Sequence, residues 1–553
     1  MRELQFGPAS VSEHGSARAP GIEVDTLAGA DQPVPRAATA VTAFVGRALR
    51  GPVDRPVTVG SFQEFQATFG GLWQPSTLSY AVEQYFENGG QVAIVVRVVN
   101  GGRPATLTLP ASGGGALTLE AQCPGTREFL RAAVDYDNVA DADTDQFNLV
   151  LQRVRAPGSE HVEEQEIFRK LSVDSESPRY VATLLADSAL VKLRGAVPPT
   201  RPRETQGGGR TLAAYVSSNP DGDDGSPLTD YDLLGSATRR TGLHALDDAE
   251  AFNFLCLPPL TREQPVGASA LLVAARYCRG RRALLMVDPP PAWATPPDAL
   301  LGIRDFAFAN EHALMYYPWV LAYDRLRGRF ESFAPCGAAA GMLARLDATN
   351  PVWSPAEAED APLRPGLRPA VQVDEGWRVK LANAGVNTLS SVRARQPIAA
   401  RTLAGPLVRS PDWRYLGLRR LALFLVTSIE RGTRWALFER NGPALWHRLE
   451  RQVADFLDAL ETDGAFPGRP PGQAWFAICD ARVNPPESEG RVQVLFGFAA
   501  LREGDWHCWL VSHGLSGSRA QGVTLNRLQS MAGRPPMDPE LDVATMLADA
   551  FRR

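Results

Sequence analysis

The order of apolar and polar residues in the first hundred positions predicts a mixture of strands and helices. Residues 21–27 alternate, so that Ile22 and Val24 fall on one side of a short strand within a polar arm. Residues 38–46 and 92–99 are almost entirely apolar, which is typical of strands covered on both faces of a sheet. Two segments with helical periodicity lie between them. We therefore expect an α/β module in this part of the chain.

The pattern changes twice in the middle of the chain. Residues 101–204 contain short alternating segments separated by polar turns, which predicts a β-rich domain, with one helix over the charged residues 160–171. Residues 205–239 are rich in Gly, Asp, Ser and Pro, and we interpret them as a linker. Residues 240–404 begin with alternating helical and strand patterns, which predicts βαβ units and a parallel sheet.

Residues 405–513 form the last predicted module. We expect a long apolar helix over 416–439 and an amphipathic helix over 443–462. Three strands follow, over 474–479, 491–498 and 506–511. Residues 514–553 are interpreted as an extension beyond this module.

The composition is that of a globular protein with several domains. The chain has 553 residues, of which 44% are hydrophobic and 22% charged, so roughly three or four domains are expected. The net charge of −5 lacks the basic excess of a general nucleic-acid-binding protein. Each of the three lysines precedes a leucine, so the phosphate-binding GxxxxGK[ST] loop is absent and a P-loop NTPase is excluded.

Cysteine spacing and hydropathy indicate the compartment. The six cysteines are scattered and lack CxxC and zinc-finger spacings, so we expect buried free thiols in a reducing compartment. The first residues lack the apolar segment of a secretion signal. The longest apolar stretches are far shorter than the roughly 20 residues of a membrane span. We therefore expect a protein that is made in the cytoplasm and stays soluble.

Motifs for catalysis, cofactors and metals are missing. The sequence contains no HExxH and no GxSxG motif, and no GxGxxG motif follows the strands of residues 240–350. The acidic loop 219–225 places Asp221 and Asp223 at calcium-ligand spacing, but Gly225 occupies the next ligand position and no Glu closes the loop. We interpret it as a solvated loop. The sequence therefore predicts no catalytic residue, no cofactor and no metal site.

An ordered series of short motifs runs through about 500 residues of the chain. Near the N-terminal end it contains Pro20-Gly21-Ile22-Glu23-Val24, Thr42-Ala43-Phe44-Val45-Gly46, Gly51-Pro52, Phe69-Gly70-Gly71 and Asn88-Gly89-Gly90. Further along it contains Tyr316-Tyr317-Pro318-Trp319, Val352-Trp353-Ser354-Pro355-Ala356, Leu381-Ala382-Asn383-Ala384-Gly385-Val386-Asn387 and Phe438-Glu439-Arg440-Asn441. In this order and spacing the chain resembles the tail sheath proteins of contractile phage tails and of related contractile injection systems. It departs from the family after Phe498 and extends beyond the family's usual end.

The resemblance implies a multidomain fold of α/β and α+β class. A discontinuous sheath core would be built from both chain ends, with residues 1–27 as a strand-exchange arm, 28–100 as the N-terminal part and 405–513 as the C-terminal part. The β-rich domain 101–204 and a subtilisin-like, non-catalytic α/β domain at 240–404 would be inserted into this core. The sequence lacks the triad motifs of subtilisins.

The resemblance also implies a function. Sheath subunits polymerise as stacked hexameric rings in a helical lattice around an inner tube, and contraction drives the tube through a target envelope. The implied partners are other copies of the chain, the inner tube protein, and the baseplate and terminal cap proteins, while co-assembly with sister sheath proteins is left open. No cofactor, nucleic acid or direct membrane insertion is expected. Assembly would take place in the cytoplasm, as part of a phage virion or phage tail-like particle.

Three groups of residues are candidates for contacts in such a lattice. The arm residues Ile22 and Val24 would add a strand to the sheet of a neighbouring subunit. The candidate acceptor strand carries Val492, Val494, Phe496 and Phe498. The charged side of the amphipathic helix is a candidate tube-facing surface, or equally an ordinary solvated helix face; its residues are Arg448, Glu450, Arg451, Asp455 and Asp458.

Two enzymatic alternatives remain for comparison. A hydrolase would use the subtilisin-shaped domain, but its triad motifs are missing. A nucleotide-dependent enzyme would use the same α/β domain, but both glycine-rich phosphate motifs are missing. We expect a structural protein and not an enzyme.

Overall fold

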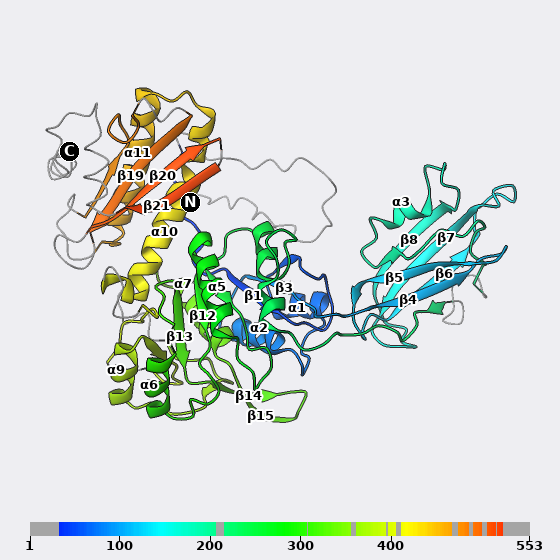
Figure 1. Cartoon of the computed structure of the whole chain (residues 1–553), viewed down its shortest axis with the longest axis horizontal. Helices are drawn as coiled ribbons and strands as arrows, with labels where there is room; N and C mark the ends of the chain where they lie inside the picture. Colours follow the sequence, from blue (N-terminus) through cyan, green and yellow to red (C-terminus); the bar gives the residue numbers. More distant parts are fainter. Residues whose placement is uncertain are drawn as a thin grey trace, which may run out of the picture.

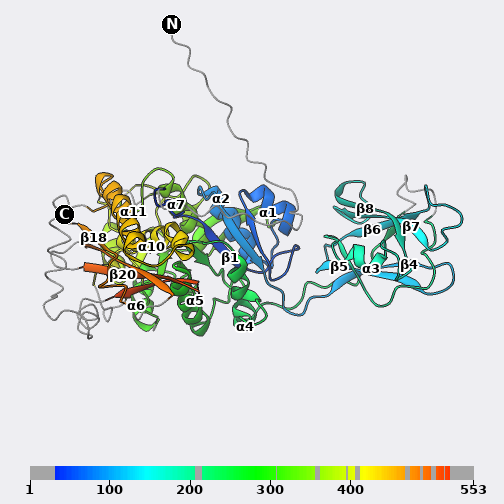
Figure 2. The same ribbon diagram turned by 90° about the horizontal axis from the view of Figure 1, so that it is seen from above.

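A computed structural model of the chain shows three regions side by side (Figures 1 and 2). An α/β body lies in the centre, a β-rich insert lies on one side of it, and a C-terminal α+β unit lies on the other. The structure describes residues 32–205, 215–306, 308–354, 361–393, 396–404, 411–466, 474–485, 490–499, 506–515 and 517–523.

The body is built on one seven-stranded sheet with the order β17-β13-β12-β11-β1-β3-β2. Its strands are β1 (Thr42–Gly46), β2 (Pro56–Val59), β3 (Ala93–Arg97), β11 (Phe254–Cys256), β12 (Leu284–Val287), β13 (Ala313–Tyr317) and β17 (Val386–Thr388). All pairs are parallel except the β2–β3 pair at one edge. β1 lies between β3 and β11, so strands from the segments 28–100 and 240–404, which we predicted as parts of separate domains, pair in one sheet.

Helices cover both faces of this sheet, as the apolar strands predicted. Phe44 and Val95 face one core together with α1 (Phe62–Phe69), α2 (Thr77–Glu87) and α7 (Cys336–Asp347). The alternate strand residues face a second core, which is completed by α4 (Asp230–Leu234), η2 (Gly242–Asp248), α5 (Ala268–Arg281), α6 (Pro296–Asp305) and α9 (Glu375–Asn383). A small sheet of β14 (Val320–Asp324), β15 (Arg329–Phe333) and β16 (Arg368–Pro369) borders the body.

Glycine allows α2 and α7 to pack closely. A Cβ atom at Gly337 would lie 2.0 Å from the backbone oxygen of Ala81, and one at Gly341 would lie 2.2 Å from that of Tyr85. The two glycines are four residues apart and therefore lie on one side of α7. Larger residues at these two positions would force the helices apart.

The insert is β-rich, as predicted. It combines a three-stranded and a four-stranded sheet around one apolar core. Its elements are β4 (Pro104–Pro110), β5 (Ala116–Pro124), β6 (Leu130–Asp135), β7 (Gln146–Val154), β8 (Val162–Ser172), α3 (Val181–Leu185), β9 (Val191–Leu193) and β10 (Val216–Ser217). The helix predicted over 160–171 is wrong, because these residues form the edge strand β8. The glutamates favour a helix locally, but pairing with β7 decides the structure.

The C-terminal unit packs two helices against an antiparallel sheet. It contains η3 (Pro411–Arg414), α10 (Leu416–Gly432), η4 (Arg434–Phe438), α11 (Pro443–Thr462), β18 (Trp475–Ile478), β19 (Arg491–Ala499), β20 (Trp506–Gly514) and β21 (Gly517–Val523). β21 belongs to the segment 514–553 that we predicted as an extension, so the sheet continues past residue 513. Val34 lies in the core of this unit and the backbone N–H of Ala37 donates to Ser428 of α10, so the N-terminal segment contributes to the unit.

Candidate assembly surfaces

The predicted acceptor strand lies inside the C-terminal sheet. β19 pairs with β18 on one side and with β20 on the other. Beyond the end of β18, the side chain of Asn484 forms the hydrogen bonds that a neighbouring strand would form. Its Oδ1 accepts from the backbone N–H of Gln493 at 2.7 Å, and its Nδ2 donates to the backbone oxygen of Gln493 at 2.9 Å. The four predicted side chains face the buried core; they are Val492, Val494, Phe496 and Phe498. This corrects the acceptor prediction, because β19 has no open flank.

The open edges of the sheet are β18 and β21 among the strands that the structure describes. The strand order is β18-β19-β20-β21, so each outer strand pairs on one flank only. Unpaired backbone N–H and C=O groups at such an edge can accept a strand from another chain. The two open edges therefore replace β19 as candidate acceptors.

The predicted arm residues Ile22 and Val24 lie outside the described residues. The described chain begins on the helices of the C-terminal unit, where Gln452 Nε2 of α11 donates to the backbone oxygen of Gln32 at 2.7 Å. Val34 packs against Gly432, where a Cβ atom would come within 2.9 Å of it. The side chain of Arg36 forms an ion pair with Asp463. The base of the arm is therefore attached to α10 and α11.

The charged side of α11 is exposed, as predicted. Arg448, Arg451, Asp455 and Asp458 are exposed, and Glu450 is half-buried. Leu449 and Val453, on the opposite side of the helix, are fully buried. The exposed charges divide into a basic N-terminal half and an acidic C-terminal half. This confirms an amphipathic helix, while its contact with a tube remains a proposal.

A row of ion pairs joins α10 to the body. Arg420 pairs with Asp347 of α7, Arg419 with Glu311 at 3.3 Å, and Glu430 with Arg282 at 2.9 Å. Burial lowers the pKa of Arg419 to about 10 despite the opposing charge of Glu311. The row fixes the C-terminal unit against the α/β body.

His312 extends this interface, and its imidazole is uncharged. Its Nδ1 lies 3.2 Å from the backbone oxygen of Ala283, and its Nε2 faces the Arg419 guanidinium. Burial, followed by the charge of Arg419, lowers the pKa of His312 to about 3, so the imidazole is neutral at physiological pH. Nε2 therefore accepts a hydrogen bond from Arg419, and Nδ1–H donates to Ala283.

Buried side chains fill the place where an α/β enzyme would hold its substrate. Such sheets bind ligands at the carboxyl ends of their strands. There, Asp288 after β12 accepts a hydrogen bond from the backbone N–H of Cys336 at 2.8 Å, and Cys256 lies beside them. Burial raises the pKa of Asp288 to about 7. The side chains of Cys256 and Cys336 are also buried, so this cluster acts in packing.

Arginines fix the neck between the body and the insert. Arg97 is buried and donates to the backbone oxygens of Ala48 at 3.0 Å, Gly51 at 2.8 Å and Pro124 at 2.7 Å. Arg47 donates to the backbone oxygens of Asp224 and Gly225 at 3.0 and 2.7 Å. The insert is therefore held firmly to the body.

The acidic loop 219–225 forms part of this neck. Asp221 accepts from the backbone and the hydroxyl of Thr106, which holds the pKa of Asp221 below its usual range. Asp224 accepts in the same way from Thr126. These carboxylates accept hydrogen bonds from protein donors, while Asp221 is exposed and Asp224 is half-buried, so the loop is solvated only in part.

Two negative findings hold for the described part of the chain. No group of three or more His, Cys, Asp or Glu side chains in these ranges is arranged to hold a metal ion. Within the same ranges, no helix combines the length and the apolar character that crossing a membrane requires.

Comparisons with known proteins concern the fold. No family model matches the sequence, and no curated protein matches it. The chain is similar to a solved sheath tail protein from Listeria innocua, with a TM-score of 0.58 and 12% identity, over 86% of this chain and 96% of that chain. It is also similar to a sheath tail protein from Desulfitobacterium hafniense, with a TM-score of 0.49 and 13% identity, over 87% and 97% of the two chains. A third similar structure is the PVC sheath of an extracellular contractile injection system in its contracted state, with a TM-score of 0.47 and 16% identity, over 88% and 96%.

The likeness to the Listeria innocua protein extends over 96% of that chain and 86% of this one. This agrees with the resemblance inferred from the ordered motifs. The chain therefore has the fold of a sheath tail protein.

Proposed function

We propose that the chain is a structural sheath subunit, which polymerises as stacked hexameric rings in a helical lattice around an inner tube and contracts to drive the tube through a target envelope. The observation that carries this proposal is the fold shared with a sheath tail protein over 86% of the chain. The α/β body serves as a subtilisin-like scaffold, and its buried strand ends favour this role over the alternative of a hydrolase.

Copies are linked by strand addition. The arm of one subunit, with Ile22 and Val24, adds to an open edge of another subunit's C-terminal sheet. β18 and β21 are the edges that support this step. Strand addition uses backbone hydrogen bonds, so the link persists while the subunits rotate relative to one another.

Contraction follows from the lattice and not from a cofactor. The extended lattice is a metastable arrangement that converts to one with more buried interface, so no nucleotide is consumed at firing. The partners are other copies, the inner tube protein through the charged side of α11, and the baseplate and terminal cap proteins. Assembly takes place in the cytoplasm as part of a phage virion or phage tail-like particle.

Assembly of the purified chain tests this function. The full chain is compared with a chain lacking residues 1–27, each with and without the cognate tube protein, by sedimentation and negative-stain microscopy. We expect rings or hollow tubes from the full chain and their loss on deletion. Monomers in every mixture, with the tube protein present, would contradict the sheath function.

A matched pair of variants separates strand addition from assembly in general. The double substitution Ile22→Asp with Val24→Asp places charges on the apolar side of the arm strand, while Glu23→Ala with Asp25→Ala changes its polar side. We expect only the first pair to prevent polymerisation. Equal polymerisation by both pairs would exclude the arm strand as the link.

A further inference from the structure

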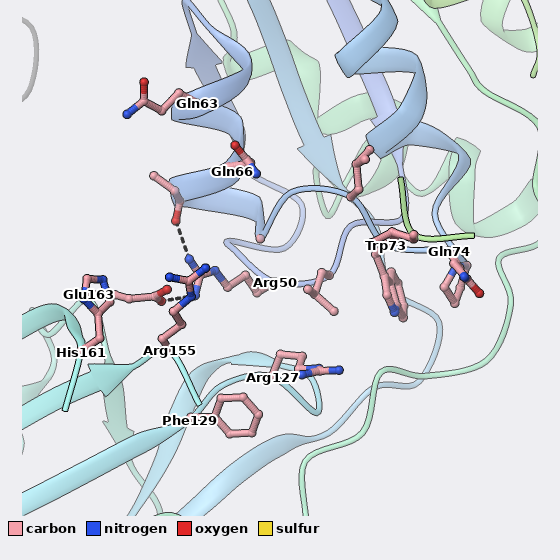
Figure 3. A pocket seen from close by; sticks show the side chains of 16 residues that line it. Arg50, Gln63, Gln66, Trp73, Gln74, Arg127, Phe129, Arg155, His161 and Glu163 are labelled. Carbon is pink, nitrogen blue, oxygen red and sulfur yellow. Dashed lines mark hydrogen bonds and ion pairs between the residues drawn. The ribbon is translucent and has the colours of Figure 1, made fainter. Parts of the chain in front are cut away.

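A cleft of about 940 Å³ lies where the insert meets the body (Figure 3). The loops after β1 and after α1 form one wall, with Arg50 from the first loop and Trp73 from the second. The near end of the insert forms the other wall, with Arg127, Arg155 and His161. The volume is in the range of clefts that bind ligands or peptide segments.

The cleft carries unbalanced positive charge. Glu163 is the one carboxylate in its lining, and it forms an ion pair with Arg50 across the cleft (Figure 3). Arg127 and Arg155 are exposed, and their guanidinium groups have no hydrogen bond or ion pair to any residue that the structure describes. A partner with carboxylates therefore fits this surface.

The opposite end of the insert carries unbalanced negative charge. The loop 136–145 between β6 and β7 contains Asp137, Asp141 and Asp143, whose carboxylates have no partner among the described residues. Asp137 and Asp141 are exposed.

The arginines beside this loop do not neutralise it. Arg201 donates to the backbone oxygens of Asp143 and Gln146, at 3.2 and 2.8 Å, and its guanidinium stacks on Tyr136. Arg179 donates to the backbone oxygens of Arg169 and Lys170. Both guanidinium groups therefore leave the aspartate carboxylates unpaired.

The two charged regions are too far apart to meet within one molecule. β6 and β7 pair antiparallel, with Leu130 opposite Arg153 at the cleft end and Asp135 opposite Asn148 at the loop end. The nine residues of β7 at about 3.3 Å each separate the two ends by roughly 30 Å. A contact between loop and cleft therefore joins two copies.

We propose that the acidic loop 136–145 of one copy docks in the basic cleft of the next copy, as a lateral contact of the assembled sheath. The proposal rests on the proposed function. The two surfaces differ, so the contact is head-to-tail and propagates into a ring or a filament, as a sheath lattice requires. Exposed charge pairs are screened by salt, so the contact weakens as ionic strength rises.

Charge exchange tests this contact in particles formed with the tube protein. The variants are Arg127→Glu with Arg155→Glu in the cleft, Asp137→Arg with Asp141→Arg in the loop, and the four changes combined. We expect each pair alone to raise the concentration needed for polymerisation about tenfold, and the combined chain to regain most of the loss.

Cross-linking gives a second readout. Chains with Arg127→Cys and chains with Asp141→Cys are mixed, assembled and treated with a short bismaleimide; the native cysteines are buried or half-buried. Intermolecular dimers are expected for this mixture, and not when Asp187→Cys, elsewhere on the insert, replaces the loop variant.

The outcomes distinguish this proposal from the proposed function. The docking proposal alone would be overturned by the following result: the wild type forms particles, both charge variants assemble normally, and no cross-linked dimer appears. If only the cleft variant fails to assemble and the combined chain does not restore assembly, the cleft binds an acidic partner other than the loop. This result would also overturn the docking proposal. Failure of the wild type to polymerise would contradict both.

Discussion

Arg420 of α10 and Asp347 of α7 form an ion pair that is buried between the C-terminal unit and the α/β body. Their side chains are 8% and 7% exposed. The same arginine side chain donates to the backbone oxygen of Thr39 at 3.3 Å, so it also contacts the chain that leads from the arm into β1. One guanidinium thus joins the segment before β1, the body and the C-terminal unit.

Removal of one partner from this pair is expected to be strongly destabilising. Asp347→Ala leaves the Arg420 charge buried without its counter-ion, and such losses cost about 3–5 kcal/mol. The measurement is thermal unfolding. Arg431→Met is the control, because Arg431 is exposed on the same helix and should change stability by less than about 0.5 kcal/mol. The combined variant Arg420→Met with Asp347→Leu should regain most of the loss, and an equal loss in that variant would exclude the buried charge as the cause.

The sequence predicted the elements better than their partners. The apolar strands at 38–46 and 92–99 were expected to be covered on both faces, and they are. The pairing of β1 with β11 was missed, because parallel pairing between residues about 210 positions apart leaves no local signal. The helix predicted at 160–171 is a strand for the same reason: its partner, β7, decides its structure.

The candidate surfaces show the same limit. The amphipathic pattern of α11 identified its exposed charges, because helical periodicity encodes burial directly. Alternation in β19 identified a buried strand face but not whether its flanks are open, since alternation describes side chains and not backbone partners. The buried Arg97 and Arg420 were not singled out, because most arginines are exposed and nothing local distinguishes these two.

Acid is expected to loosen the attachment of β20 and β21 to α10. His513 of β20 lies 2.7 Å from the hydroxyl of Thr433 and 2.7 Å from that of Ser518, and burial lowers its pKa to about 4. In the unfolded chain this pKa is about 6.5, so the unfolded state takes up the proton first as the pH falls. The stabilisation that depends on neutral His513 is therefore fully present above about pH 6.5 and is lost progressively as the pH falls to about 4.

Hydrogen exchange of the β20 and β21 amides measures this effect locally. Between pH 7 and pH 4.5, the free energy that protects these amides from exchange should fall by roughly 2 kcal/mol more in the wild type than in the His513→Gln variant, because the Gln side chain cannot be protonated. His312 also has a lowered pKa, but it is present in both proteins and cancels in the comparison. The same acid loss in both proteins would exclude His513 as the titrating group.

Substitution of Arg97 is expected to release the insert from the body. Arg97→Met removes donors to the backbone oxygens of Ala48, Gly51 and Pro124 and leaves these acceptors buried, which costs about 1–3 kcal/mol for each unsatisfied group that water does not reach. Limited proteolysis should then cut the neck faster, while the core of the insert stays folded. Arg103→Met is the control, since Arg103 is exposed in the same neck. Equal cleavage of the two variants would show that Arg97 does not hold the insert in place.

The division of charge along α11 predicts opposite effects of its two halves on tube binding. Reversal of Arg448 and Arg451 to Glu should weaken co-assembly if the facing tube surface is acidic there, and reversal of Asp455 and Asp458 to Arg should weaken it if that surface is basic. Both pairs are exposed, so thermal stability should change by less than about 1 kcal/mol.

Co-sedimentation with the tube protein at low and high salt measures these effects. A tube-facing helix gives at least one variant with about tenfold weaker binding at low salt, and this difference shrinks at high salt because the charges are screened. Normal co-sedimentation of both variants, together with normal stability, would contradict the tube-facing role and show that the charged side of α11 is an ordinary solvated helix face. Loss of binding together with loss of stability would instead point to misfolding, so both readouts are taken on the same protein preparations.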